Sequence, residues 1–242
     1  MKAQITIHNF KYEVDFSKGL DISIPLNFNG PQPNTYGVDK ARAKAYTDLN
    51  FVGDTRLGGP CNFETYTFTP HCNGTHTECI GHITNERTSI LSSLNEEFIP
   101  STLITVTTKK SSESYIPDLN AVIIRTLPNS EEKKRKNYMK ENSCFFSIEA
   151  ISYLVSLGVK HLLVDTPSVD RLFDDGYLTA HNIFWETEKK KFNPKSRNKT
   201  ITEMIYVADS INDGQYLLNL QIPPFISDAA PSRPILYSIN EL

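Results

Sequence analysis

Residues 71–82, HCNGTHTECIGH, bring three histidines, two cysteines and one glutamate together within twelve residues. Cysteine sulfur, histidine nitrogen and glutamate oxygen are all ligands of zinc, and this mixture is harder and more open than the Cys/His sets of structural zinc fingers. A catalytic metal site is therefore favoured over a structural one. Two other interpretations stay open, namely a thiol nucleophile with a histidine base and a chance cluster of polar loop residues.

The local conformation decides which of these side chains share a face. Alternate residues of an extended chain project to the same side, so Cys72, His76 and Glu78 would face one way in a strand. A helix would turn Glu78 away from Cys72, and Asn73 and Gly74 are weak helix formers. We therefore expect an extended stretch, in which Gly74 leaves open space where an ion or substrate can approach.

The remaining polar residues of the stretch have separate expected roles. His82 lies six residues beyond His76 and just after Gly81, so it can turn back toward the site as an acid/base. Cys79 is expected to be a small buried hydrophobe. His71 is expected to be a surface histidine with its hydrogen bonds satisfied.

Composition limits the class of protein. The chain has 242 residues, 39% of them hydrophobic and 22% charged, which is typical of a globular protein with a substantial core. The net charge of -3 and the pI of about 6.1 argue against nucleic acid as a partner. Neither an export signal nor an apolar run of about 18 residues is found, so we expect a cytoplasmic protein without a membrane partner. The four cysteines are then expected to be reduced thiols.

The pattern of strands and helices predicts one α/β domain. Alternating or β-branched runs predict strands within residues 4–16 (a pair), 101–108, 121–126, 160–166, 214–222 and 233–239. A short helix is expected within residues 38–49.

The strongest helix signal covers residues 147–159, SIEAISYLVSLGV. Ser147 can cap its start, Ile148, Ile151, Leu154 and Val155 form an apolar stripe, and Gly158 ends it. The order strand, helix, strand over residues 121–165 implies a parallel strand pair with one covered face. No linker or repeat divides the chain, so residues 1–242 are expected to be a single domain.

The stretch CNGTHTECIGH resembles the signature His-x-Gly-Thr-His-x-Asp-x-Pro-x-His of the cyclase family, metal-dependent hydrolases that include bacterial kynurenine formamidase. Gly74, Thr75, His76 and His82 keep the family's residues at the family's spacing. The resemblance covers nearly the whole chain, since DFSKGLDISIPL, VKHLLVDTPSVD and APSRPIL also look like segments of this family.

The signature departs from the family at three positions. Cys72 stands where the first metal-binding histidine is expected, Glu78 replaces the aspartate and Ile80 replaces the proline. Thiolate and imidazole both suit zinc, and glutamate keeps the carboxylate. His71 is not expected to take the place of Cys72, because neighbouring residues of a strand face opposite sides.

The resemblance also assigns ligands outside the stretch. His181 and Glu203 match the family's remaining metal-binding histidine and glutamate by context. The interval between them exceeds the family's by about the length of the basic run at residues 188–199, which we interpret as an inserted loop. A solvated surface is the ordinary role of such a run, and a basic flap beside a site for an anionic substrate is the alternative.

Membership in this family would imply a swivelling β/β/α fold, with a mixed barrel-like sheet flanked by helices, in a homodimer or homotetramer. It would also imply one or two divalent ions per chain, zinc or manganese. Cys72, His76 and Glu78 would hold the first ion, and Glu78, His181 and Glu203 the second. His82 would move a proton to the leaving nitrogen.

Three hypotheses for function remain. The first is a metal-dependent hydrolase that cleaves the C–N amide bond of a small molecule, either an N-formyl arylamine such as N-formylkynurenine or a cyclic amide. The second is a metal-binding protein without turnover. The third is a cysteine hydrolase that pairs Cys72 or Cys79 with His82, or with the distant His161 or His181. Trp185 is expected to belong to the core.

Overall fold

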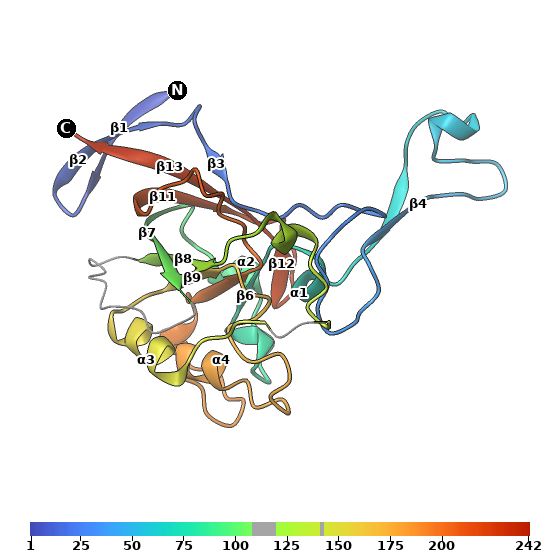
Figure 1. The fold of residues 1–242 in the computed structure, drawn as a ribbon. Helices are drawn as coiled ribbons and strands as arrows, with labels where there is room; N and C mark the ends of the chain where they lie inside the picture. The colour runs from blue at the N-terminus through green and yellow to red at the C-terminus, as the bar shows by residue number, and fades with distance from the viewer. Residues whose placement is uncertain (108–119, 141–142) are drawn as a thin grey trace.

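The structure, a computed structural model, describes residues 1–107, 120–140 and 143–242 (Figure 1). Its strands are β1 (Lys2–Ile7), β2 (Phe10–Asp15), β3 (Leu20–Asp21), β4 (Arg42–Ala45), β5 (Glu64–Thr67), β6 (His76–Cys79), β7 (Phe98–Thr107), β8 (Ala121–Leu127), β9 (His161–Val164), β10 (Thr200–Glu203), β11 (Gly214–Gln221), β12 (Ala229–Pro231) and β13 (Arg233–Glu241). Its α-helices are α1 (Pro70–Asn73), α2 (Ile90–Ser93), α3 (Ile148–Ser156) and α4 (Thr179–Phe184). Short 3-10 turns cover Thr55–Leu57, Ile80–His82, Glu131–Arg135 and Pro194–Ser196.

One large mixed sheet organises the chain. Among the described residues it has eleven strands, ten of them in the order β1-β2-β13-β11-β7-β8-β9-β10-β6-β12, with β3 beside β13. The strands β7, β8, β9 and β10 run parallel, whereas the flanking pairs are antiparallel. The fold is therefore a mixed α/β fold with few helices, and none of the described helices is long and apolar enough to span a bilayer.

Helices α3 and α4 lie side by side against one face of the sheet (Figure 1). Apolar side chains from these helices and from the parallel strands form the core between them, including Ile151, Leu154, Phe184, Trp185, Val122, Leu162 and Ile201. Trp185 is fully buried there, which confirms its expected core position. Burying these side chains is the main favourable term that fixes α4, and thereby His181, against the sheet.

The strongest sequence signals are confirmed. Ser147 caps α3 by accepting a hydrogen bond from the amide of Ala150, and Gly158 follows the helix with a φ of 76°. Ile148 is exposed, however, so the buried stripe of the helix is narrower than predicted. In the sequence β8 precedes α3 and β9 follows it, and the two strands pair in parallel, as the order strand, helix, strand implied. The other predicted strands are also present, except that residue 108 lies outside the described residues.

The helix predicted within residues 38–49 is wrong. Residues Arg42–Ala45 instead form β4, which pairs with β5 in an antiparallel hairpin. Alanine, lysine and arginine are good helix formers, but intrinsic propensity is a weak determinant, and pairing with the partner strand outweighs it. Asn29 adds to this outcome, because its side-chain amide donates to the carbonyl oxygen of Ala43 (2.8 Å).

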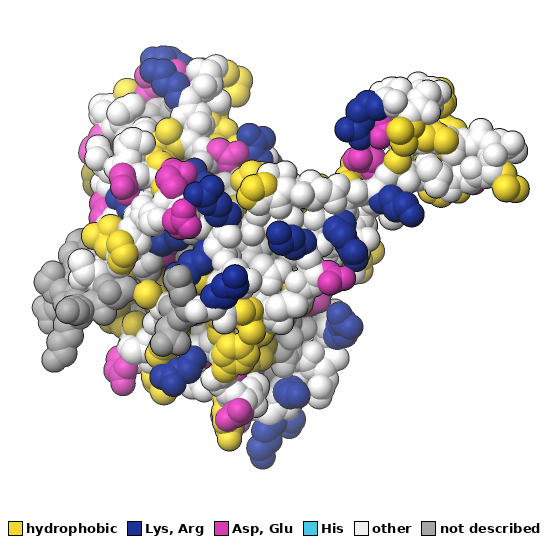
Figure 2. Space-filling view, turned by 45° about the vertical axis from the view of Figure 1, so that its right-hand side comes forward, with side chains coloured by type: hydrophobic (Ala, Val, Ile, Leu, Met, Phe, Trp, Pro, Cys, Tyr) yellow, Lys and Arg dark blue, Asp and Glu magenta, His cyan; other side chains and the backbone are white. Residues whose placement is uncertain are grey.

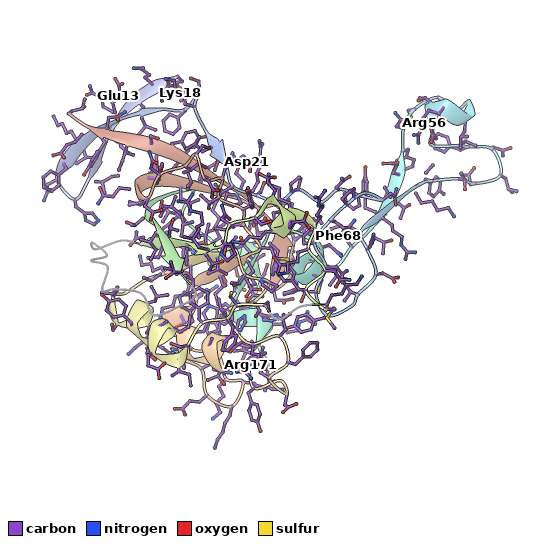
Figure 3. The ribbon with its side chains drawn as sticks, in the orientation of Figure 1. Glu13, Lys18, Asp21, Arg56, Phe68 and Arg171 are labelled. Carbon is purple, nitrogen blue, oxygen red and sulfur yellow. The ribbon has the colours of Figure 1, made fainter. Side chains whose placement is uncertain are left out.

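The hairpin and its loop, residues 42–67, project from the body as an arm (Figure 1). Figure 3 places Arg56 in the arm and Phe68 where the arm meets the body. Tyr46, Phe51 and Phe63 contact one another in the arm, with ring centroids 5.3 to 6.2 Å apart. Leu49 is fully exposed nearby, and Figure 2 shows apolar side chains on the surface of the arm. The arm thus presents apolar surface far from the main core.

His161 on β9 gives the fold a predicted pH dependence. Its side chain is 1% exposed, and its Nδ1 lies 2.9 Å from Thr200 Oγ1. Burial lowers the pKa of His161 to about 4, whereas an unfolded histidine titrates near pH 6.5. Between these values the unfolded chain binds a proton that the folded chain does not. The free energy of unfolding should therefore fall by roughly 3 kcal/mol as the pH drops from about 6.5 to about 4.

Urea denaturation of the parent chain and of His161→Asn across this pH range would measure the effect. Asparagine can keep a hydrogen bond to Thr200 but does not titrate, so its curve should lack this part of the acid destabilisation. His8→Asn, at an exposed position, is the matched control and should behave like the parent. Equal pH dependence in His161→Asn and the parent would contradict the prediction.

Candidate metal centre

The pairing of β6 with β10 brings the first two site residues together. Glu203 on β10 lies directly across from His76 on β6, and His76 Nε2 is 3.5 Å from Glu203 Oε2. His76 Nδ1 donates to the carbonyl oxygen of Gly74 (3.1 Å), which leaves the lone pair of Nε2 directed at Glu203. The amide of Val169 donates to Glu203 Oε1 (2.8 Å) and fixes the carboxylate. Both side chains are buried.

Glu78 lies two residues after His76 on the same strand and therefore on the same face. Its Oε1 is 2.9 Å from His181 Nε2, and its Oε2 is 3.7 Å from His82 Nε2. The alternation predicted for His76 and Glu78 is thus present within β6. Glu78 therefore lies between His181, near one of its carboxylate oxygens, and His82, near the other.

His181 reaches the site from α4, and Asp170 holds it there. His181 Nδ1 donates to Asp170 Oδ2 (2.6 Å), and the amides of Ala180 and His181 donate to the same carboxylate (2.7 and 3.1 Å). Leu178, the N-cap residue that precedes α4, makes no side-chain cap hydrogen bond. Asp170 therefore caps the helix from the loop after β9 and also orients the imidazole so that Nε2 faces Glu78.

A second pair of histidines lies on the other side of Glu78. The rings of His71 and His82 are stacked, with centroids 4.5 Å apart. His82 Nδ1 donates to Asp228 Oδ2 (3.3 Å), and His71 Nε2 is 3.2 Å from the same oxygen and 3.4 Å from Glu78 Oε2. Asp228 directly precedes β12, whose pairing with β6 brings it to this place.

The donor atoms suit a divalent cation. Among the described residues, two groups of three place all their ligand atoms within 4.8 Å of one another, namely His76, Glu78 and Glu203, and His71, Glu78 and His82. His76 Nε2 is buried without a hydrogen-bond partner, so its lone pair is available, and His71 Nε2 is buried between the carboxylates of Glu78 and Asp228. Imidazole nitrogens combined with carboxylate oxygens are ligands for zinc and manganese. Neither group includes Cys72 or His181.

Electrostatics favour a charged Glu78 in this buried place. Burial alone would raise its pKa, but the charges of His82, His181 and His71 lower it on balance. For His181 the effects have the opposite sign. Burial alone would lower its pKa, but the charge of Glu78 and the hydrogen bond to Asp170 raise it well above its usual range. The Glu78 carboxylate therefore stays ionised, as metal binding requires.

The two buried thiols are poorly suited to nucleophilic attack. Burial, with a contribution from Glu203, raises the pKa of Cys72 to about 11. Burial also raises the pKa of Cys79, and its Sγ donates to the carbonyl oxygen of Thr88 (3.2 Å). Because the thiolate is the reactive species, the structure gives the cysteine-hydrolase hypothesis no support.

The extended conformation predicted for residues 72–78 is wrong in its first half. Pro70 starts the short helix α1, and the side chain of Asn73 accepts a hydrogen bond from the amide of Thr69 (2.7 Å), which stabilises the turn despite a weak propensity. The expected role of Gly74 is also corrected. A Cβ there would lie 3.1 Å from the carbonyl oxygen of Ile24, so the glycine permits close packing of two segments.

Three residues of the cluster were not among the predicted site residues. His71 was expected at the surface, but it is mostly buried beside Glu78. Asp170 belongs to the segment VKHLLVDTPSVD, whose resemblance to the family was the only available signal. Asp228 lies 146 residues from His82, and no local pattern connects the two.

An aromatic pair stands at the rim of the cluster. The rings of Tyr36 and Phe173 are 6.4 Å apart in an edge-to-face arrangement, and both side chains are partly exposed. Burial raises the pKa of Tyr36 to about 12, and the nearby carboxylates of Glu203 and Asp174 contribute. Tyr36 is thus close enough to the cluster to sense its charge.

Comparisons with known proteins identify the family to which this chain belongs. Residues 20–171 match the family described as "Putative cyclase", so the chain belongs to the cyclase family. Among individual relatives, kynurenine formamidase from Bacillus cereus is 25% identical over 236 residues, covering 92% of this chain and 99% of that protein. Kynurenine formamidase from Bacillus cytotoxicus is 24% identical over 233 residues, covering 91% and 97%.

Solved structures show the same fold at lower identity. Isatin hydrolase A from Labrenzia aggregata, bound to benzyl benzoate, superposes with a TM-score of 0.60 at 16% identity, covering 91% of this chain and 93% of that one. A structure titled as a predicted metal-dependent hydrolase from Bacillus stearothermophilus gives a TM-score of 0.59 at 16% identity, covering 91% and 98%. At this identity the likeness concerns the fold alone.

Proposed function

We propose that this protein is a metal-dependent hydrolase that cleaves the C–N amide bond of a small molecule, either an N-formyl arylamine such as N-formylkynurenine or a cyclic amide. The observation that carries the proposal is the buried convergence of His76, Glu78 and Glu203 with unpaired imidazole nitrogen and charged carboxylate. The names of the relatives, kynurenine formamidase and isatin hydrolase, support the reaction type.

The ligands of the cation follow from the donor atoms and from the family. His76, Glu78 and Glu203 would hold a zinc or manganese ion, and the family pattern adds His181 and, at the remaining position, Cys72. One or two ions per chain fit this number of ligands. When bound, such an ion lowers the pKa of water and polarises the scissile carbonyl group.

His82 is the catalytic acid/base of the proposal. Its Nδ1 donates to Asp228, so its Nε2 has the free lone pair and faces Glu78. Nε2 can take a proton from the attacking water and return it to the leaving nitrogen. Asp228 keeps the ring in the tautomer that this transfer needs.

Chelation tests the proposal directly. Hydrolysis of N-formylkynurenine or another N-formyl arylamine should disappear after exhaustive chelation and return with zinc or manganese. Full activity in the chelated protein would exclude the mechanism. Bound metal without hydrolysis of either linear or cyclic amides would instead favour the metal-binding protein without turnover.

The aromatic rim supports an aryl substrate and gives a further prediction. Phe173→Ala should raise the KM for an N-formyl arylamine by about 2–10-fold, because an aromatic contact contributes roughly 0.5–1.5 kcal/mol. The KM for a formylated alkylamine should change little. Tyr177→Ala removes a more exposed aromatic ring from the same loop and is the control. An equal change for both substrates would contradict the proposed contact.

The overall organisation is also proposed. Residues 1–242 would form a single swivelling β/β/α domain in which residues 188–199 are an insertion. This segment folds back on the end of α4, since Lys199 Nζ donates to the carbonyl oxygen of Phe184 (3.2 Å) and the Trp185 indole, just after the helix, donates to the carbonyl oxygen of Lys199 (3.1 Å). Equal calorimetric and van't Hoff enthalpies of unfolding would be expected of one domain, and two separate transitions would refute it.

The partner of the arm is proposed to be a second copy of the chain, in a homodimer or homotetramer. Leu49→Asp should weaken self-association by about 10–100-fold, because a buried apolar side chain contributes roughly 1.5–3 kcal/mol. Sedimentation velocity would measure the shift toward monomer. Ile226→Asp, at another exposed apolar position outside the arm, is the control and should not dissociate the assembly. Dissociation by the control alone would refute the assignment.

We propose a cytoplasmic enzyme that binds neither nucleic acid nor membranes. The four cysteines are free thiols, an arrangement that a reducing compartment maintains, and this supports the proposal. Fractionation of cells that express the full chain would test the location, and recovery with membranes or in an oxidising compartment would refute it.

A further inference from the structure

We propose that His71, and not Cys72, binds the first cation together with Glu78. The family pattern gives this position to residue 72, so the chain would have moved one metal-binding imidazole by one residue. The inference rests on the proposed function, because it assigns a ligand of the same centre. It predicts a centre with nitrogen and oxygen ligands only, in which Cys72 remains a buried thiol beside the ion site.

The position of His71 Nε2 carries the inference. This atom is buried between two carboxylates, 3.4 Å from Glu78 Oε2 and 3.2 Å from Asp228 Oδ2, without a well-aligned hydrogen bond to either. A buried polar atom without a hydrogen bond is costly, and a cation shared with a neighbouring carboxylate would satisfy it. His71 and Glu78 belong to one of the two groups of mutually close ligand atoms, whereas Cys72 belongs to neither group.

The local backbone explains why His71, and not the adjacent Cys72, faces Glu78. In a strand, His71 and Cys72 would face opposite sides, but both belong to the short helix α1, where successive side chains are about 100° apart. Pro70 starts this helix, and the chain becomes extended again from Gly74. The helical turn therefore directs His71 toward Glu78 even though the signature spacing belongs to Cys72.

Neighbouring groups hold the His71 ring in this place. It stacks on His82 with an angle of 28° between the rings, and its centroid is 5.3 Å from that of His76. Asp228 is fixed by the sheet, since its carbonyl oxygen accepts a hydrogen bond from the amide of Cys79 (3.0 Å). A ligand that is already oriented loses little freedom when it binds an ion.

Cobalt binding distinguishes the two ligands. A thiolate bound to Co²⁺ gives an intense sulfur-to-metal charge-transfer absorption in the near ultraviolet, whereas imidazole and carboxylate ligands do not. We expect the Co²⁺-loaded parent protein to lack this band. Cys72→Ser should bind Co²⁺ with the same stoichiometry and with an affinity within about threefold of the parent. His71→Ala should lose an ion or bind it about 100-fold more weakly, since even groups that only orient a ligand are worth roughly 10–100-fold.

Cys72→Ser and His71→Ala are controls for each other, because the two residues are adjacent in α1. Thermal unfolding of each metal-free variant would check the fold, and His71→Asn, which should bind Co²⁺ as weakly as His71→Ala, replaces it if alanine prevents folding. A charge-transfer band in the parent that disappears in Cys72→Ser would overturn the inference. Unchanged Co²⁺ binding in both His71 variants would also overturn it, while leaving the proposed function intact. Failure of the parent to bind Co²⁺, zinc or manganese would overturn the proposed function as well.

Discussion

Glu78→Gln is expected to lower kcat/KM for an N-formyl arylamine by about 10³-fold or more, the scale on which removal of a charge-stabilising group slows an enzyme. Glu78 is the one residue common to both groups of mutually close ligand atoms. Glutamine has nearly the same shape, but its neutral amide binds a divalent cation poorly. Bound metal, measured by elemental analysis, should fall together with the activity.

Glu78→Asp is the matched control for this prediction. It keeps the charge, shortens the side chain by one methylene, and restores the residue that the family signature carries at this position. We expect it to keep its metal and to remain within about tenfold of the parent in kcat/KM. Equal losses in both variants would show that side-chain length, and not charge, makes Glu78 necessary.

Stability must be measured in parallel, because Glu78→Gln also removes a buried charge. His181 and His82 would lose their anionic neighbour, and breaking a buried ion pair typically costs about 3–5 kcal/mol. Activity should therefore be compared at a temperature where both variants are folded. An inactive variant that still binds the parent's complement of metal would contradict the assignment of Glu78 as a ligand.

Local signals in the sequence predicted those elements that short-range physics controls. The cap at Ser147 and the turn at Gly158 define α3, and β-branched residues define β7 and β8. The alternation that places His76 and Glu78 on one face is equally local. Such features need only the neighbours along the chain, so a single sequence reveals them.

Tertiary contacts decided the elements that local signals missed. Residues Arg42–Ala45 have ordinary helix formers and still make a strand, because β5 lies beside them. Gly74, at the end of α1, packs closely against Ile24, which is far away in the chain. Propensity is a weak prior at such places, and the direction of His71 followed from the turn of α1.

The site residues also divide into those that the sequence indicated and those that only tertiary contacts bring together. The match to the family signature indicated His76, Glu78 and His82, and context within the family indicated His181 and Glu203. The register of β6 with β10 then brings Glu203 opposite His76, and no pattern in either strand specifies that register. Asp228 acts through a hydrogen bond to His82, 146 residues away, so only the folded chain identifies it, whereas the resemblance to the family also covered the segment that contains Asp170.

Asp170→Asn should weaken metal binding by about 10–100-fold, with a similar loss in kcat, as is typical for a group that orients a ligand histidine. Three N–H donors, from the amides of Ala180 and His181 and from His181 Nδ1, converge on this carboxylate. Asparagine has one acceptor oxygen, so its amide nitrogen must face at least one of them. If it faces His181 Nδ1, the proton moves to Nε2, which can then bind no cation.

Asp174→Asn separates this effect from simple loss of a loop contact. Asp174 lies four residues further on and accepts hydrogen bonds from the backbone amides of Gly176 (3.0 Å) and Leu178 (2.6 Å), with no bond to a histidine. Its replacement should lower the unfolding temperature about as much as Asp170→Asn does, but leave the affinity for zinc within about threefold. Competition with a fluorescent chelator would measure zinc affinity in both variants. Equal weakening in the two would show that the loop, and not the orientation of His181, controls metal binding.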